Sequence, residues 1–217
     1  MSQLEELISK PVTIDAESTV ADVTKIMFDN KIARVLITED EKITSIITER
    51  DLGLFFLENK ADRALNKIPL RELAKPLFTI PKSIEVKECA KKMVEKNIGS
   101  LGISENNQVI GIVTKTDLVK YFAKNHQNET TVEKYMSKHY SWAYSNESLA
   151  KIASKMVERK ITRLIVKNPQ EIPIGIITIR DLFELVMPRG TQGGDAYLEG
   201  FNAEHGLGKT TLAKEVM

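Results

Sequence analysis

The sequence has little cysteine, histidine or tryptophan, no long apolar run and no excess of either charge. One Cys excludes an internal disulfide, and the three His residues share no ligand spacing, so no metal site is expected. Thirty-one basic and thirty acidic residues leave a formal net charge of +1, which provides no global field for nucleic acid or anionic lipid. No stretch approaches the roughly 20 apolar residues of a membrane span. Nucleic acid and membranes are therefore not expected as partners.

The remaining composition is that of a globular protein, with 42% hydrophobic and 28% charged residues. Residues 1–6 have no basic flank followed by an apolar run, so a signal peptide is not expected and the protein is predicted to be cytoplasmic. Cys89, Ala90, Met93 and Val94 fall on one side of a predicted helix. This pattern predicts that Cys89 is a buried structural thiol.

A short motif, Thr-x-x-Asp-Leu, occurs three times. The copies begin at Thr48, Thr114 and Thr178, at intervals of 66 and 64 residues, and two apolar residues precede each threonine. Apolar segments further upstream are also similar in the three copies. Self-similarity at such an interval is typical of a repeat protein, whose function is sought where repeats meet.

Each copy closes a longer unit that reads β-α-β-β-α. In the third copy, Tyr140, Trp142 and Tyr144 alternate in a β-like stretch, which predicts a strand with its aromatic side chains in the core or in the wall of a cleft. An amphipathic helix follows, then two strands joined by a polar turn, as at 33–38 and 43–48 of the first copy. A short leading segment precedes every unit: Leu4–Ile8, Leu70–Ala74 and Val132–Met136.

These units predict the domain organisation: repeat 1 at residues 1–60, repeat 2 at 66–125, repeat 3 at 130–187, and a linker or tail at 188–217. The predicted fold class is α/β (α+β), with a small three-stranded sheet in each repeat. A unit of about 60 residues buries only part of its apolar surface. We therefore expect the repeats to pack as pairs, repeat 1 with repeat 2.

The order of these elements resembles the CBS (cystathionine β-synthase) domain, and Gly111–Leu118 is the closest single match to its motif. The resemblance covers about residues 4–187 in three copies. It implies that two repeats pack as a Bateman module. It also implies that the clefts between repeats bind an adenosine-containing ligand, namely AMP, ADP, ATP or S-adenosylmethionine, which regulates an attached or partner protein. No catalytic residue is expected.

The resemblance also implies which residues line the clefts. The motif aspartate can accept two hydrogen bonds from the ribose hydroxyls, and the helix N-terminus beside it favours phosphate. An isoleucine two residues before each threonine would border the purine, and an arginine on a neighbouring strand could bind phosphate as a planar fork. The predicted residues are Arg34, Ile46, Thr48 and Asp51 in repeat 1, Ile112, Thr114 and Asp117 in repeat 2, and Arg163, Ile176, Thr178 and Asp181 in repeat 3. Repeat 2 has Gly99-Ser100 where the others carry arginine.

Each of these residues also has an interpretation without a ligand. Thr-x-x-Asp at a helix start is a capping box worth about 1 kcal/mol. An arginine at a strand edge can simply be solvated. The whole protein could then be a structural or oligomerisation module with empty clefts.

The last 30 residues contain a second pattern. Residues 203–210 fit a relaxed phosphate-loop motif, but no strand is predicted before them, so ATP hydrolysis is not expected. Residues 214–217 instead resemble a leading segment, as if a fourth repeat began there. Because repeat 3 has no complete partner in this chain, we expect a homodimer built through repeat 3, unless the tail covers that surface.

Overall fold

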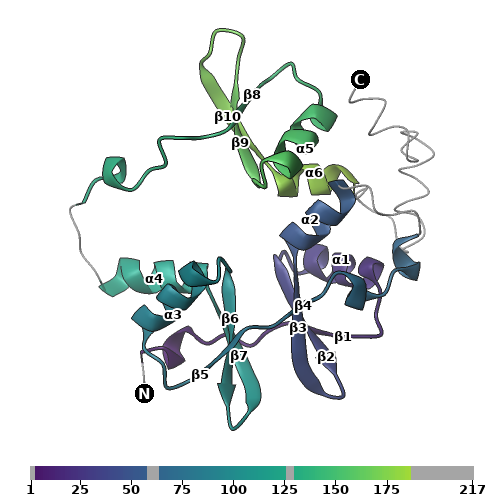
Figure 1. Ribbon diagram of the computed structural model, residues 1–217, viewed down its shortest axis with the longest axis vertical. Coiled ribbons are helices and arrows are strands. Elements are labelled where there is room, and N and C mark those ends of the chain that lie inside the picture. Colours follow the sequence, from purple (N-terminus) through teal and green to yellow (C-terminus); the bar gives the residue numbers. More distant parts are fainter. Residues whose placement is uncertain (1–2, 58–63, 126–129, 187–217) are drawn as a thin grey trace. The chain divides into compact units, whose positions relative to one another are not determined.

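The computed structural model describes residues 3–57, 64–125 and 130–186 and divides them into two compact units. Of the described residues, unit 1 contains 3–16, 34–47, 74–125 and 130–136, and unit 2 contains 17–33, 48–57, 64–73 and 137–186. The predicted β-α-β-β-α order is confirmed in each repeat (Figure 1). The tail predictions, including the phosphate-loop pattern, lie outside the described residues. No described helix is long and apolar enough to cross a membrane.

Unit 1 contains two small sheets. The first has the order β1-β2-β3-β4, and the second has the order β5-β6-β7. The strands are β1 (Thr13–Asp15), β2 (Arg34–Glu39), β3 (Lys42–Thr48), β4 (Lys75–Pro76), β5 (Thr79–Pro81), β6 (Ser100–Glu105) and β7 (Gln108–Thr114). Helices α3 (Val86–Glu95) and α4 (Lys115–Asn125) lie on one side of the second sheet (Figure 1). The short helices of this unit are η1 (Glu5–Leu7) and η4 (Val132–Lys134). The first sheet thus has four strands rather than the predicted three, because β4 is supplied by repeat 2.

Unit 2 contains the helices of repeat 1 and the strands and helices of repeat 3. Its sheet has the order β10-β9-β8, with β8 parallel and β10 antiparallel to β9. The elements are α1 (Val20–Asp29), α2 (Glu49–Leu57), η2 (Leu65–Lys67), η3 (Leu70–Glu72), β8 (Trp142–Tyr144), α5 (Leu149–Glu158), β9 (Arg163–Lys167), β10 (Pro173–Thr178) and α6 (Ile179–Val186).

Repeats 1 and 2 each add the residues that precede their β-α-β-β-α unit to the sheet of the other repeat. Ser9 of repeat 1 and Ile112 of β7 donate backbone hydrogen bonds to each other's carbonyl, both at 3.0 Å. In the reciprocal arrangement, Lys75 of β4 pairs with Ile46 of β3. Leu4, from the leading segment of repeat 1, is 1% exposed and packs in the core of repeat 2. Each repeat is therefore completed by a segment of the other, which accounts for the expected pairing.

The core of repeat 2 is built on α3, β6 and β7. Cys89 is fully buried there, beside Met93 and Leu101, and burial raises the pKa of its thiol to about 11. The prediction of a buried structural thiol is confirmed.

The first long helix of each repeat ends in the same way. The second residue after the helix adopts a positive φ, and the following isoleucine donates its N–H to the carbonyl of a methionine five residues earlier, at 3.0 Å in all three repeats. This is the hydrogen bond of the Schellman motif. The residues are Lys31, Ile32 and Met27 in repeat 1, Asn97, Ile98 and Met93 in repeat 2, and Lys160, Ile161 and Met156 in repeat 3. The motif directs the chain into the strand on which the predicted arginines lie.

The core of repeat 3 does not contain the aromatic residues around β8, although the core was one of the two places that the sequence predicted for them. Ala143 is fully buried, whereas Trp142 on one side of it is 36% exposed and Tyr140 is 53% exposed. The expectation that Tyr140 and Trp142 lie in the core is wrong, and the alternative that these aromatic residues line the wall of a cleft stays a prediction. Strand alternation turns Ala143 toward the helices and the aromatic residues toward the opposite face.

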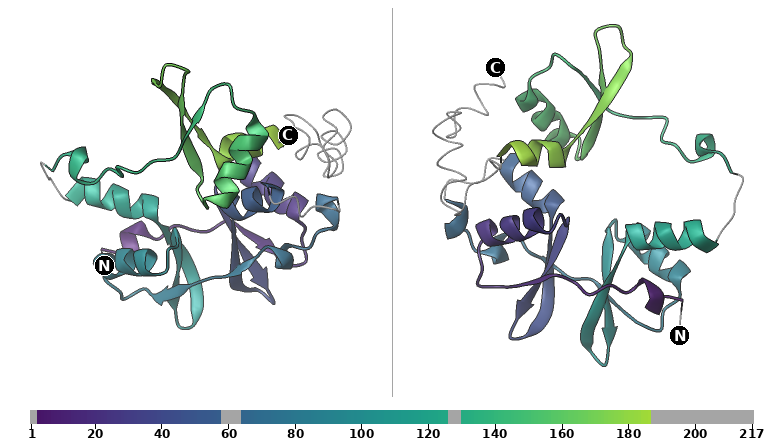
Figure 2. Two further views of the ribbon diagram at one scale, coloured as in Figure 1. Left: turned by 45° about the horizontal axis from the view of Figure 1, so that its top comes forward. Right: turned by 180° about the vertical axis from the view of Figure 1, so that it is seen from behind.

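The helices of repeat 3 contact α2 of repeat 1, and both views of Figure 2 show α2 beside α6. Arg180 Nε lies 3.6 Å from Glu49 Oε1, and Arg50 donates to the carbonyl oxygen of Lys160 at 3.2 Å. Gly53 permits the close approach, because a Cβ there would lie 2.6 Å from Cδ1 of Ile179. Repeat 3 is thus not without a partner, as its helix face is covered by α2.

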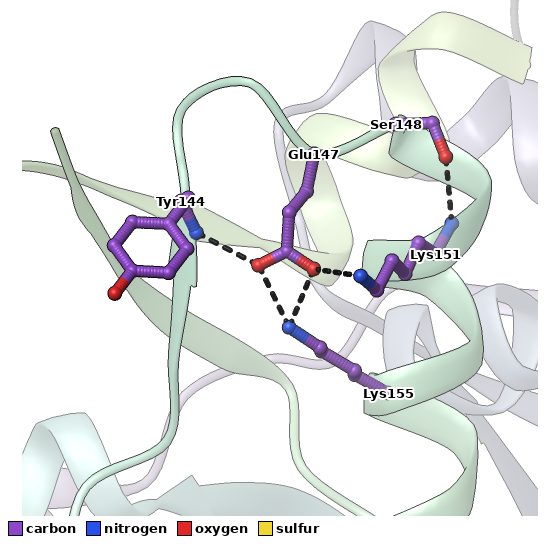
Figure 3. Close-up of polar contacts among 5 residues, drawn as sticks. All are labelled: Tyr144, Glu147, Ser148, Lys151 and Lys155. Carbon is purple, nitrogen blue, oxygen red and sulfur yellow. Dashed lines mark hydrogen bonds and ion pairs between the residues drawn. The ribbon is translucent and has the colours of Figure 1, made fainter. Parts of the chain in front are cut away.

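A network around Glu147 joins β8 to α5 (Figure 3). The carboxylate accepts hydrogen bonds from Lys155 Nζ at 2.7 and 2.8 Å and from the backbone N–H of Tyr144 at 2.8 Å. Lys151 Nζ lies 3.1 Å away, and the side chain of Glu147 is 9% exposed. Burial alone would raise the pKa of Glu147, but these hydrogen bonds outweigh it and lower the pKa to about 2.

We expect Gly53→Val to destabilise the protein by about 1–3 kcal/mol, because its side chain would overlap the buried Ile179. Intrinsic helix propensity alone favours valine over glycine by a few tenths of a kcal/mol, so the two effects have opposite signs. Urea denaturation measures the difference. In an Ile179→Ala background the cost should shrink, and an equal cost in both backgrounds would exclude this contact as the cause.

We expect Glu147→Gln to lower the free energy of unfolding at neutral pH by about 1–3 kcal/mol, because three donors lose a charged acceptor. Because folding depresses the pKa of Glu147, its stabilisation is present above the unfolded pKa of about 4.3 and is lost as pH falls toward 2. The difference between parent and variant should therefore shrink between pH 5 and pH 2.5. Glu158→Gln, at an exposed glutamate that ends α5, is the control and should change little.

Candidate functional site

The three Thr-x-x-Asp motifs begin α2, α4 and α6, and all three form capping boxes. In each, the threonine N–H donates to Oδ2 of the aspartate, at 3.0, 2.9 and 2.7 Å in chain order. The aspartate N–H donates back to the threonine hydroxyl at 3.3 to 3.4 Å. The capping interpretation of Thr48 and Asp51, Thr114 and Asp117, and Thr178 and Asp181 is therefore confirmed.

Capping does not use the whole carboxylate. In Asp117 and Asp181 every cap hydrogen bond is accepted by Oδ2, and within the described part of the chain Oδ1 accepts no hydrogen bond. A carboxylate oxygen accepts up to two hydrogen bonds. The cap and a ligand contact are thus compatible in the same residue, and the ribose role of these aspartates remains a prediction.

Arg34 of repeat 1 reaches the motif of repeat 2. Its Nη1 donates to the carbonyl oxygen of Gly99 at 2.9 Å, and the same oxygen accepts the N–H of Lys115, the first residue of α4, at 3.0 Å. Burial lowers the pKa of Arg34 below its usual value, while the negative charge of Asp117 opposes this shift. A guanidinium from one repeat and a carboxylate from the other therefore face each other at the N-terminus of α4.

The groups at the N-terminus of α4 can bind an anion and can accept hydrogen bonds from hydroxyl groups. The guanidinium has five N–H donors, and the bond to Gly99 uses one of them. The first amides of α4 add further donors and the positive end of the helix dipole. Asp117 supplies the acceptor.

The three predicted isoleucines are placed differently. Ile112 is 5% exposed and pairs with Ser9, and Ile46 pairs with Lys75, so both lie where the other repeat docks its leading residues. Ile176 is 54% exposed. Arg34, Ile46, Ile112, Thr114 and Asp117 all belong to unit 1.

The remaining predicted residues belong to unit 2. Thr48 and Asp51 begin α2, and Thr178 and Asp181 begin α6, the two helices joined by the ion pair of Glu49 and Arg180. Arg163 is exposed, and no hydrogen bond or ion pair of its side chain is found among the described residues. The arginines of repeats 1 and 3, which look equivalent in sequence, are therefore in different environments.

Two features of unit 1 were not predicted from the sequence. The carbonyl of Gly99 anchors Arg34, and no side-chain pattern signals a backbone acceptor. A groove of about 640 Å³ also lies elsewhere in unit 1, and none of the predicted site residues lines it. Its apolar wall consists of Leu4, Ile84, Val86, Leu118 and Phe122. Within the described ranges, no group of three His, Cys, Asp or Glu residues could hold a metal ion.

The chain is similar in sequence to two proteins of one archaeon. The chain is 30% identical over 141 residues to the L-aspartate semialdehyde sulfurtransferase of Methanocaldococcus jannaschii, covering 64% of this chain but 27% of that protein. It is 25% identical over 193 residues to protein MJ1225 of the same organism, covering 82% and 68% of the two chains.

The crystal structure of MJ1225, a proposed archaeal homologue of the AMPK γ subunit, has the same fold. Its TM-score is 0.77 at 22% identity, and the match covers 92% of this chain and 77% of that chain. The family model of the CBS domain matches residues 4–54, 70–124 and 132–188. These three matches cover most of the sequence and coincide with the three structural repeats. The chain therefore belongs to the CBS domain family.

Proposed function

We propose that the protein is a regulatory sensor that binds an adenosine-containing nucleotide where repeats 1 and 2 meet in unit 1. The observation that supports this proposal is the approach of Arg34 to the N-terminus of α4, beside Asp117. A guanidinium and a carboxylate at the N-terminus of the same helix suit the phosphate and the ribose hydroxyls of a nucleotide. Binding of adenosine-containing ligands in clefts between repeats is common in this family.

In this proposal each group has a separate role. Asp117 Oδ1 accepts the ribose hydroxyls while Oδ2 keeps the cap with Thr114. Arg34 and the first amides of α4 hold phosphate oxygens, and Ile112 borders the purine. AMP needs one such anion site, and ADP and ATP extend beyond it toward solvent.

The ligand would act by stabilising one arrangement of the repeats. Because Arg34 belongs to repeat 1 and Asp117 to repeat 2, a nucleotide held by both favours the arrangement of the paired repeats in which these two residues are close. A protein that recognises this arrangement would read the change. We propose no catalytic step at this site.

Isothermal titration calorimetry of the whole protein with AMP, ADP, ATP and S-adenosylmethionine tests the proposal. A ligand that binds the folded state also raises the apparent stability by RT ln(1 + [L]/Kd). Heat and a raised melting temperature with at least one ligand are expected. The absence of both with all four would leave the alternative, a structural module with empty clefts.

The residue-level test is Asp117→Asn. The amide oxygen can keep the cap, but the charged ribose contact is lost, so we expect binding to weaken by about 1–3 kcal/mol. Asp22→Asn is a matched control, because Thr19 and Asp22 form the same capping box at the start of α1, with Thr19 N–H donating to Oδ2 at 2.9 Å. Both variants should lose similar stability, measured by thermal denaturation. If the Asp117→Asn and Asp22→Asn variants bind the nucleotide with equal affinity, Asp117 serves only as a helix cap.

A further inference from the structure

Repeat 3 carries a group of aromatic residues at β8. The ring centroids of Trp142 and Tyr144 lie 4.8 Å apart in an edge-to-face contact. Lys167 Nζ lies 4.8 Å from the ring centroid of Trp142 and 5.9 Å from that of Tyr140. These contacts join the four residues into one group, which we call the aromatic cluster. Figure 3 shows the Tyr144 ring on the side of β8 away from α5, so the cluster lies outside the hydrophobic core of repeat 3.

Pairing of repeats does not account for these aromatic residues. The first strand of each repeat has three residues, and the middle residue is buried in all three strands. The two flanking positions are exposed in the paired repeats, where they hold Thr13 and Asp15 in β1 and Thr79 and Pro81 in β5. Pairing of repeats 1 and 2 therefore leaves the positions equivalent to Trp142 and Tyr144 uncovered. Exposed aromatic residues that gather outside a core indicate an interaction surface.

Polar contacts hold the aromatic cluster in one arrangement. Tyr144 donates its hydroxyl to Glu171 Oε1, and Lys167 Nζ lies 3.3 Å from Glu171 Oε2. The hydrogen bond from Tyr144 and the ammonium of Lys167 lower the pKa of Glu171, so its carboxylate stays ionised at neutral pH. Lys167 and Glu171 thus neutralise each other. The cluster is ordered before a ligand arrives, which reduces the entropic cost of binding, and this ion pair offers no excess charge to a polyanion.

The cluster has unused hydrogen-bond donors. Within the described part of the chain, the indole N–H of Trp142 and the hydroxyl of Tyr140 have no partner, and these side chains are 36% and 53% exposed. An indole N–H can only donate. A matching ligand must therefore present carbonyl oxygens beside apolar groups that can lie on aromatic rings. A polyproline II helix presents both, because it has no internal hydrogen bonds and its carbonyl oxygens stay available.

We propose that the aromatic cluster of repeat 3 is a docking surface for a proline-rich segment of a partner protein. Proline rings would pack on Tyr140 and Trp142, and carbonyl oxygens of the segment would accept hydrogen bonds from the Tyr140 hydroxyl and the Trp142 indole. Because the cluster and the polyproline II helix are both ordered before they meet, little conformational entropy is lost. The surface lies within repeat 3 and does not depend on the nucleotide proposed for unit 1.

The first test uses the fluorescence of Trp142, the single tryptophan of the chain. In the whole protein without a ligand, acrylamide should quench the emission. Titration with a decaproline peptide should shift the emission to shorter wavelength and protect it from acrylamide, with saturation. A Gly-Ser peptide of the same length is the control and should do neither, because it is flexible and has no rings. Shielding of Trp142 in the free protein, no response to decaproline, or an equal response to both peptides overturns the proposal.

Variants of Tyr140 test the proposed contacts and keep the tryptophan probe. Tyr140→Ala should weaken decaproline binding about tenfold or more, because it removes a central aromatic contact. Tyr140→Phe keeps the ring and loses the donor, so a loss of about twofold to tenfold is expected. Phe122→Ala is the matched control, since Phe122 of α4 is 51% exposed and lies outside the cluster, and it should bind like the parent. Equal affinities of the Tyr140→Ala and Phe122→Ala variants contradict the proposal.

Two further ligands test the chemistry of the surface. Decauridylate RNA should leave the Trp142 emission unchanged, because binding of single strands needs a positively charged surface beside the aromatic rings. AMP should neither shield Trp142 nor displace decaproline. If the RNA binds the cluster in place of the peptide, the aromatic residues serve nucleic acid. If AMP shields Trp142, they line a nucleotide cleft. Either result overturns the proposal.

Discussion

A three-stranded sheet with two helices on one side cannot cover its own edge, and the structure depends on this constraint. Repeats 1 and 2 meet it by exchanging short segments, with Ser9 on Ile112 and Lys75 on Ile46. Leu4 then fills the core of repeat 2 rather than that of its own repeat. Because backbone hydrogen bonds and core packing are both shared, neither repeat is a closed folding unit. Pairing is thus part of the fold and not an association of finished domains.

The candidate site follows from the same exchange. Pairing brings the first residue of β2 to the carbonyl of Gly99, so that a half-buried guanidinium lies near the carboxylate that caps α4. Burial disfavours the charge of Arg34, and Asp117 offsets part of that effect. An anionic ligand with hydroxyl groups could contact both residues at once, which is why we propose a nucleotide rather than a neutral molecule. In repeat 3 the same residue types are present, but Arg163 is exposed.

The sequence was sufficient to predict the repeats, their element order, the buried Cys89 and the capping boxes, because these depend on local periodicity and on neighbours three residues apart. It did not predict β4, the swapped position of Leu4 or the Gly99 carbonyl, because such features involve backbone groups or partners about 100 residues away. The aromatic residues around Ala143 could be placed only in the core or in the wall of a cleft, because hydrophobicity does not reveal which face of a short strand is covered. The contact of α2 with α6 was missed for a related reason, since Gly53 has no side chain to signal it.

The central claim is that a nucleotide binds where repeat 1 meets the start of α4. Hydrogen–deuterium exchange of the whole protein, with and without saturating AMP, measures this most directly, because the first amides of a helix have no partner within the helix. The account predicts slower exchange at residues 115–118 and at the start of β2, with little change in the first turn of α1, which has the same capping box. Unchanged exchange at residues 115–118, or protection confined to other segments, would contradict it.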